Sequence, residues 1–435
     1  MTESSLPGCA ASPAESARRR TLFAADWVVP VSSPPIPEGG VLVEGPRIVE
    51  VGRAQVLRRA GADEVRDLAG HLLLPGLVNP HTHLELSFLR GRLRAASPFD
   101  RWVEALVGEL LGADEATFTE AIRSGLAEVL AGGMTAVGDI SRTGRSYPLL
   151  SEAGLKGTVF IEILGFHPRQ EMEALERAEA VLVRLAEKPV AALRVGITPH
   201  APYSTSPGLY REAALARRRG LPVAVHLAET PEEDLFVREG RGPLRDLLER
   251  LGVWDEDFPI PRCSPVAYLE RLGVLDGALA VHCNTVDNQD DIGLLKAAGA
   301  RVVLCPGSNA WFARPDRHPA PRMLQAGVPC VLGTDSLASN DRLDLLAEMS
   351  LCAAAHPELT PETVLHMGTD WAAEALGLAE VCGSLEAGKA ADLVALRLPA
   401  SGVEEPVSWV VAEATGEAVA LVVLDGMVAH EARDA

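Results

Sequence analysis

The chain has 435 residues, 47% of them apolar, and carries 40 Lys and Arg against 60 Asp and Glu, a formal net charge of −20. This length suits two or three domains, or one large barrel with an accessory domain. So negative a surface repels phosphate backbones and anionic lipid, which argues against nucleic acid and membrane partners. No run in the sequence approaches the ~18 consecutive apolar residues that a membrane span requires.

The first residues are small and polar and end in three arginines, so we expect residues 1–20 to be disordered. They contain no apolar core and do not form a secretory signal. The seven cysteines are odd in number and scattered, which indicates reduced thiols rather than a disulfide framework. These features predict a cytoplasmic enzyme.

Short apolar runs between glycine and proline turns begin near residue 21, and runs of the same kind recur near the C-terminus. Runs of this length and spacing are typical of β-strands. We therefore expect residues 21–72 and 378–435 to pair into one small β domain, with residues 73–377 inserted between its halves.

In the inserted segment, apolar runs alternate with stretches of helical periodicity. The runs cover residues 73–79, 134–140, 157–163, 193–199, 222–228, 278–284, 300–306 and 329–335. Eight parallel strands with helical crossovers predict an α/β fold, a (β/α)8 TIM-type barrel. Residues 84–118 and 231–274 are too long for simple crossovers and follow carboxyl ends of strands, so we expect them to be loops or lids over the pocket.

Metal-binding residue types fall at the carboxyl ends of the predicted strands, where barrels place their active sites. Side chains two apart on a strand share a face, so His81 and His83 can converge on one point. A lone histidine here would be a structural residue, but histidines at successive strand ends predict a metal site. The set comprises His81, His83, His200, His226, His282 and Asp335.

Imidazole nitrogens with one carboxylate suit zinc, and also iron or other first-row ions. Glu229 follows His226 by three residues, and a carboxylate there can act as a proton shuttle. The alternative is that Glu229 has only a structural role, in which its negative charge is stabilised by the positive N-terminal end of the helix predicted after Pro231.

The ordered motifs PGLVNPHTHLELS, HLAE, VHC, GTDS and GSLEAGKAADLVAL resemble those of the amidohydrolase superfamily over about residues 21–430. They are most similar to its mononuclear branch, which includes cytosine, guanine and adenosyl-type deaminases and triazine hydrolases. The resemblance implies a metallo-dependent barrel, flanked by a β-sandwich built from both termini.

The resemblance also implies roles for individual residues. It makes His81, His83, His226 and Asp335 the metal ligands, and Glu229, His282 and Asp335 the catalytic groups. Binuclear relatives use a bridging carboxylate, commonly a modified lysine at the end of the fourth strand. None of the four lysines lies there, which favours a single divalent ion, zinc first and iron or manganese next.

Four residues are candidates for substrate binding, and each could instead have a purely structural role. The segment TPHAPYST resembles that of adenosylhomocysteine, methylthioadenosine and aminofutalosine deaminases, and implies that His200 contacts substrate rather than only ending a strand. Glu85 binds a ribose hydroxyl or only pairs within its loop. Arg90 meets a substrate carboxylate or is solvated surface charge. Trp311 stacks on a flat base or packs a lid.

These expectations together predict a hydrolytic deaminase. Its metal-bound hydroxide attacks an adenine nucleoside derivative, aminofutalosine first and then adenosylhomocysteine or methylthioadenosine, and ammonia leaves. The alternative is another heterocycle (guanine, oxidised purine, pterin, cytosine or triazine) with the same mechanism. A non-catalytic scaffold has no reason to keep Glu229 and His282. Partners are then a small-molecule substrate and a second copy of the chain, in a homodimer.

Overall fold

The computed structural model describes residues 19–95, 98–314 and 317–432. Most of the predicted disordered segment, residues 1–18, lies outside this range. Its last residue, Arg20, already begins the first strand, so the expected order boundary at residue 20 lies slightly too late.

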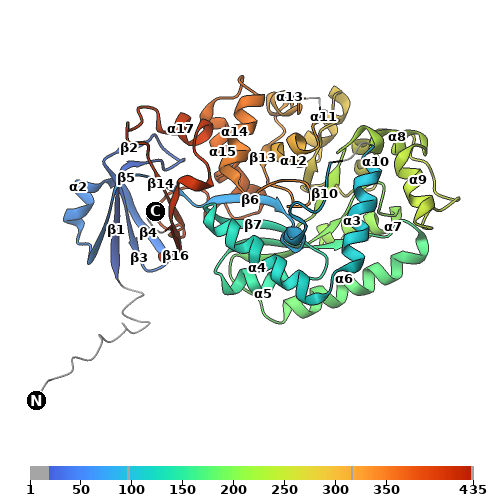
Figure 1. Cartoon of the computed structure of the whole chain (residues 1–435), viewed down its shortest axis with the longest axis horizontal. Coiled ribbons are helices and arrows are strands. Elements are labelled where there is room, and N and C mark those ends of the chain that lie inside the picture. Colours follow the sequence, from blue (N-terminus) through green and yellow to red (C-terminus); the bar gives the residue numbers. More distant parts are fainter. Residues whose placement is uncertain (1–18, 96–97, 315–316, 433–435) are drawn as a thin grey trace, which may run out of the picture.

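Strands from both ends of the chain share one eight-stranded sheet, which Figure 1 shows at one end of the molecule in blue and red. β5 connects the N-terminal and the C-terminal strands of this sheet, because it pairs with β1 in parallel and with β14 antiparallel. In order across the sheet the strands are β16 (Met427–Glu431), β15 (Val419–Leu424), β14 (Leu393–Arg397), β5 (Glu64–Pro75), β1 (Arg20–Val28), β3 (Gly39–Glu44) and β4 (Arg47–Arg53), with β2 (Ile36–Pro37) on β1.

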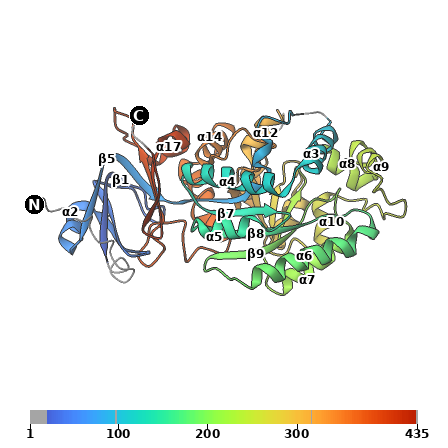
Figure 2. The ribbon, with the colours of Figure 1, turned by 60° about the horizontal axis from the view of Figure 1, so that its bottom comes forward.

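Eight parallel strands form two further sheets of four in the middle of the chain. The first contains β6 (Leu77–Thr82), β7 (Met134–Ser141), β8 (Lys156–Ile163) and β9 (Leu193–Pro199); the second contains β10 (Ala224–Leu227), β11 (Leu279–His282), β12 (Arg301–Leu304) and β13 (Cys330–Leu332). Single parallel bridges join the two sheets at both edges, Ile197 to Val223 and Thr82 to Asp335. Figure 2 shows helices packed outside these strands.

The first predicted barrel strand, residues 73–79, is wrong as a single element. Its first half ends β5 in the terminal sheet, and its second half begins β6. The two meet at Gly76, where a Cβ atom would lie 2.1 Å from Thr135 Oγ1. A residue with a side chain does not fit there, so glycine permits the close approach at the junction.

Helices fill most of the remaining chain, and several begin alike. Ser206, Thr230, Ser264 and Thr360 each cap a helix whose first residue is proline. The helices are α2 (Ala54–Leu57), α3 (Asp100–Gly112), α4 (Glu115–Ala131), α5 (Ser146–Glu152), α6 (Glu171–Ala186), α7 (Pro207–Arg218), α8 (Pro231–Glu239), α9 (Pro243–Arg250), α10 (Pro265–Arg271), α11 (Gln289–Ala297), α12 (Pro306–Trp311), α13 (Ala320–Ala326), α14 (Leu345–Ala355), α15 (Pro361–Met367), α16 (Asp370–Ala375) and α17 (Pro406–Ala412). Short 3₁₀ turns are η1 (Arg58–Ala60), η2 (Leu84–Leu89), η3 (Pro168–Gln170) and η4 (Gly416–Ala418).

The two long intervals expected to be loops are largely helical. Residues 84–118 hold η2 and α3, and residues 231–274 hold α8, α9 and α10. In α9 the buried residues Leu244, Leu247 and Leu248 lie on one helix face, so packing stabilises the helix. Within the described residues, none of the helices combines the length and apolar character that a bilayer crossing requires.

Candidate metal centre and active site

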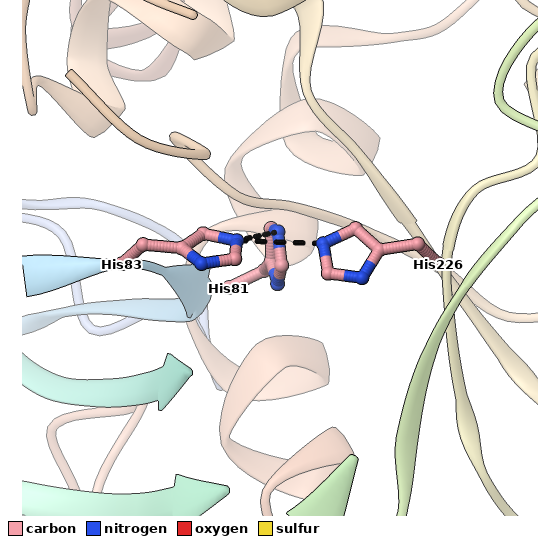
Figure 3. Close-up of side chains that lie close together, drawn as sticks. All are labelled: His81, His83 and His226. Carbon is pink, nitrogen blue, oxygen red and sulfur yellow. Dashed lines mark hydrogen bonds between the residues drawn. The ribbon is translucent and has the colours of Figure 1, made fainter. Parts of the chain in front are cut away.

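Four side chains from the two parallel sheets meet at one point. His81 belongs to β6, His83 follows it, His226 belongs to β10 and Asp335 follows β13. The Nε2 atoms of His81 and His83 lie 3.3 Å apart, and those of His83 and His226 lie 3.4 Å apart. Figure 3 shows the three imidazoles pointing their nitrogens toward one another.

Four of the six distances among these atoms are close to the edge length of a tetrahedral zinc site. Zn–N bonds of 2.0–2.1 Å place neighbouring ligand atoms about 3.3–3.4 Å apart. Asp335 Oδ1 lies 3.4 Å from His81 Nε2 and 3.6 Å from His83 Nε2, close to this edge length. Three imidazoles and one carboxylate are also a donor set that zinc accepts.

Hydrogen bonds to neighbouring residues orient the side chains of His226 and Asp335 within the cluster. His226 Nδ1 lies 3.1 Å from the His200 carbonyl oxygen; donation to that carbonyl leaves Nε2 with its lone pair facing the cluster. Asp335 Oδ2 accepts a hydrogen bond from Ser339 Oγ at 2.8 Å, which leaves Oδ1 toward the histidines. Both side chains therefore present one defined ligand atom.

Burial and mutual proximity keep His81, His83 and Asp335 in their metal-binding protonation states. Burial lowers the pKa of His81, and burial together with the charge of His81 lowers the pKa of His83 well below its ordinary value. Burial alone would raise the pKa of Asp335, but hydrogen bonding to His81 and the charge of His282 outweigh it, so this pKa lies well below its usual range. Neutral imidazoles and an ionised carboxylate are the forms that bind a cation.

His282 and Glu229 lie beside the cluster and face each other. His282 Nε2 is 3.9 Å from Glu229 Oε2, and both side chains are almost fully buried. Burial lowers the pKa of His282 well below its ordinary value, so its imidazole is neutral. A neutral imidazole and a carboxylate in contact can pass a proton between them and a bound molecule.

An ion pair that the sequence analysis missed holds the other oxygen of Glu229. Arg314 donates from Nη2 to Glu229 Oε1 at 2.7 Å and from Nη1 to Asn309 Oδ1 at 2.7 Å. Asn309 donates in turn to Asn284 Oδ1, and Asn284 donates to the carbonyl oxygen of Glu229. This closed ring of contacts leaves Glu229 Oε2 as the oxygen available to a substrate.

Replacing Arg314 by methionine is expected to lower kcat/KM about ten- to hundredfold, because a charge-assisted hydrogen bond contributes about 1.5–3 kcal/mol. Methionine keeps an unbranched apolar stem but removes the guanidinium group and its charge. Steady-state kinetics measures the effect, and Arg101→Met, an exposed change on α3, is the control. Wild-type kinetics in Arg314→Met would show that the ion pair does not orient Glu229.

His200, predicted to contact substrate, directly follows β9 and packs against the cluster. Its ring centroid lies 4.9 Å from that of His226. Ser204 Oγ donates to the Ala201 carbonyl at 3.2 Å, so it accepts from His200 Nδ1, 2.6 Å away. Burial lowers the pKa of His200 to about 3. The ring is neutral, and its Nε2 is an acceptor for a substrate N–H or O–H.

Glu85 is engaged with its own surroundings. Its carboxylate accepts hydrogen bonds from Ser141 Oγ, from the backbone N–H groups of Arg142 and Thr143, and from Thr143 Oγ1. These four donors match the alternative in which Glu85 pairs locally, and contact with a ribose stays a prediction.

The nearby buried residue Asp139, on β7, was missed in the sequence because one acid in an apolar strand has no distinguishing pattern. It accepts from the Leu84 backbone N–H at 2.8 Å, directly after His83. Burial raises its pKa to about 8. Asp139 thus positions the turn that carries His83.

Asp139→Asn is expected to change the pH dependence of stability. Between pH about 4 and 8 the folded carboxyl keeps a proton that the unfolded chain releases, so this group makes the wild type less stable as pH rises. Asparagine does not titrate. The free energy of unfolding of the variant, relative to that of the wild type, should therefore rise by about 1.4 kcal/mol for each pH unit in this window. Urea unfolding at pH 5, 6 and 7 measures the slope; a constant difference would contradict it.

The other two predicted substrate residues lie in contacts of their own. Arg90 forms an ion pair with Glu128 of α4, so binding a substrate carboxylate would require this pair to open. Trp311 is partly buried, with its ring 4.9 Å from Phe312, which packs on Phe99 and Trp102. This packing matches the lid alternative, and stacking on a base stays a prediction.

The chain is similar to known proteins over most of its length. The chain matches the Amidohydrolase family over residues 72–429. It is 32% identical over 417 residues to a 5-methylthioadenosine/S-adenosylhomocysteine deaminase of Syntrophobacter fumaroxidans, covering 91% of this chain and 89% of that protein. It is 33% identical over 340 residues to an aminodeoxyfutalosine deaminase of Deinococcus radiodurans, covering 75% and 78%.

Solved structures show the same fold. An adenosine deaminase from Xanthomonas campestris with bound zinc superposes with a TM-score of 0.80 at 26% identity, over 94% of this chain and 93% of that one. An aminofutalosine deaminase from Helicobacter pylori gives a TM-score of 0.82 at 24% identity, over 94% and 99%. The chain belongs to the amidohydrolase family.

Proposed function

We propose that this protein is a metal-dependent hydrolytic deaminase of an adenine nucleoside derivative. The observation that carries the proposal is the cluster of three imidazoles and one carboxylate, with neighbouring ligand atoms 3.3–3.6 Å apart and the facing pair of Glu229 and His282 beside it. The two sequence relatives named as nucleoside deaminases support the substrate class.

His81, His83, His226 and Asp335 would hold one divalent ion. Zinc is the first choice, because the spacing fits its bond lengths and the Xanthomonas campestris deaminase binds it. Iron and manganese are the alternatives. When bound, such an ion supplies a Lewis acid that lowers the pKa of a coordinated water from 15.7 to about 7.

The protein's own groups would move the protons. Asp335, ionised and held by Ser339, accepts a proton from the attacking water. Glu229 delivers a proton to the ring nitrogen through Oε2, because Arg314 occupies Oε1. His282, neutral and buried, hydrogen-bonds the oxygen that adds to the ring carbon. Glu229 then takes the hydroxyl proton of the adduct and passes it to the amino group, so that ammonia leaves and a ring carbonyl remains. The proton held by Asp335 returns to Glu229 and restores both carboxyl groups.

The purine side of the substrate would meet His200, whose Nε2 accepts a hydrogen bond. The group at the 5′ carbon is less defined. The prediction of aminofutalosine loses two of its supports, because Glu85 is saturated by local donors and Arg90 is paired with Glu128. Aminofutalosine, adenosylhomocysteine and methylthioadenosine therefore enter the test as equals.

The test is ammonia release by the zinc-loaded protein from a panel of heterocycles. It contains these three nucleosides together with adenosine, guanine and cytosine. Turnover of an adenine nucleoside would support the proposal and identify the preferred 5′ group. No turnover of adenine compounds by a stoichiometrically metallated protein would reject the substrate class and leave another ring as the alternative.

We also propose that the two parallel sheets close into one (β/α)8 barrel, which begins at β6 rather than at the predicted residue 73 and extends to about residue 377. Bridges join the parallel sheets at both edges, and one apolar cluster gathers side chains from seven of the eight strands, among them Val78, Phe160 and Val303. For residues 21–72 and 378–435 we propose a β-sandwich, because Phe23 and Val41 share an apolar cluster with Leu393 and Val423 from the other end of the chain.

We further place the protein in the cytoplasm. The six cysteines within the described residues are free thiols, as expected of a reducing compartment. A homodimer stays an expectation from the resemblance to barrels of this kind.

A further inference from the structure

The backbone at His282 has an unusual conformation. His282 ends β11 and Cys283 follows it, and their φ angles of 73° and 54° lie in the left-handed region. Each such non-glycine residue costs about 1–2 kcal/mol. Two in succession persist only where the surroundings hold them.

The peptide unit between His282 and Cys283 is held at both of its polar groups. The Cys283 N–H donates to the Leu227 carbonyl of β10 at 2.8 Å. The His282 carbonyl oxygen lies 2.6 Å from His318 Nε2. The first contact is strand pairing, whereas the second comes from a side chain outside the sheet.

The partners of His318 define its tautomer. The Ala320 N–H donates to His318 Nδ1 at 3.0 Å, so Nδ1 carries no proton. Nε2 therefore bears the hydrogen and donates it to the His282 carbonyl. The ring is 8% exposed and neutral, since burial lowers its pKa to about 4. One donor and one acceptor are both satisfied.

We infer that His318 is a positioning residue that fixes the His282–Cys283 peptide and thereby directs the His282 ring toward Glu229. The inference rests on the proposed function, in which His282 is catalytic. His318 touches neither substrate nor the proposed ligands through its ring nitrogens; it acts on the backbone that carries His282.

The packing around His318 is open, so its hydrogen bonds rather than its bulk hold the His282 carbonyl in place. The residue lines two neighbouring cavities, one shared with Leu304 and Cys352 and the other with Asn284 and Pro319. Because hollow space adjoins the ring, a smaller side chain fits there without a clash. The direction of the His282 carbonyl is then set by whether a donor reaches it.

Two substitutions separate the two hydrogen bonds. In His318→Asn, the amide oxygen takes the place of Nδ1 and can accept from Ala320, but no donor reaches His282. In His318→Gln, the longer amide places an N–H near Nε2 and can donate to the His282 carbonyl. The pair thus distinguishes anchoring of α13 from positioning of His282.

We expect kcat per zinc-loaded site to fall about ten- to hundredfold in His318→Asn, with KM little changed, and to stay within about threefold of wild type in His318→Gln. Thermal unfolding of each variant measures the structural cost separately. Wild-type kcat in His318→Asn, or equal loss in both variants, would overturn the inference. If His318→Asn does not fold, loss of kcat in folded His318→Gln overturns it.

A second readout does not depend on activity. In a crystal structure of His318→Asn, the φ angle of Cys283, which sets the plane of the His282–Cys283 peptide, should leave the left-handed region, whereas it should stay there in His318→Gln. An unchanged φ in His318→Asn would reject the inference even if the panel shows no deaminase. If the wild type turns over no nucleoside but the φ angle in His318→Asn changes as expected, only the proposed function is rejected.

Discussion

Glu229→Gln is expected to lower kcat about 10²- to 10⁴-fold, the range that a general acid–base contributes. Glutamine keeps the shape of the side chain and can still accept from Arg314 at its amide oxygen. It cannot carry the proton that the ring nitrogen and the leaving amine need. Coupled-enzyme detection of ammonia on the preferred nucleoside gives kcat directly.

The control for this change is Glu232→Gln, three residues along the chain. Glu232 accepts from the Phe99 N–H through Oε1, and a glutamine oxygen can keep that bond. Zinc content should be equal in wild type and both variants, because Glu229 is not one of the proposed ligands. A Glu229→Gln protein with wild-type kcat would remove Glu229 from the mechanism.

His83→Ala is expected to abolish stoichiometric zinc binding and with it turnover. His83 Nε2 lies at the centre of the cluster, 3.3–3.6 Å from atoms of His81, His226 and Asp335. A ligand that binds only the folded state stabilises it by about 4 kcal/mol at a thousand times its Kd. The wild type should therefore melt higher with zinc than after chelation, whereas His83→Ala should melt at one temperature in both.

Metal analysis after gel filtration measures the same change directly. His71→Ala is the matched control, because His71 lies on β5 in the terminal sheet, where its Nδ1 is 2.9 Å from the Ala69 carbonyl oxygen. Its zinc content should equal that of the wild type. One zinc per chain retained by His83→Ala would contradict the proposed ligand set.

Much of the fold was predictable because strand signals are local. Apolar runs such as residues 157–163 and 193–199 reappear as β8 and β9, and the spacing of His81 and His83 already places both on one face of a strand. The structure then brings these histidines next to His226, as the strand-end argument predicts.

Other parts depend on contacts between distant segments and carry no local signal. Arg314 and His318 lie in a polar stretch without periodicity, and only the tertiary fold brings them to Glu229 and His282. The break at Gly76 was hidden inside one apolar run, because only Thr135 on another strand makes the glycine necessary. The helices α9 and α10 within residues 231–274 were missed, because the length of this interval was interpreted as a loop.

The pairing of β5 with β14 has a consequence for synthesis on the ribosome. Leu72 and Leu74 pair with Leu396 and Val394, residues made only after the whole parallel-strand region has emerged. Until then β5 presents an apolar edge without its final partner, and such edges recruit other chains. The C-terminal strands therefore protect full-length molecules from aggregation, and a chain truncated before β14 exposes that edge permanently.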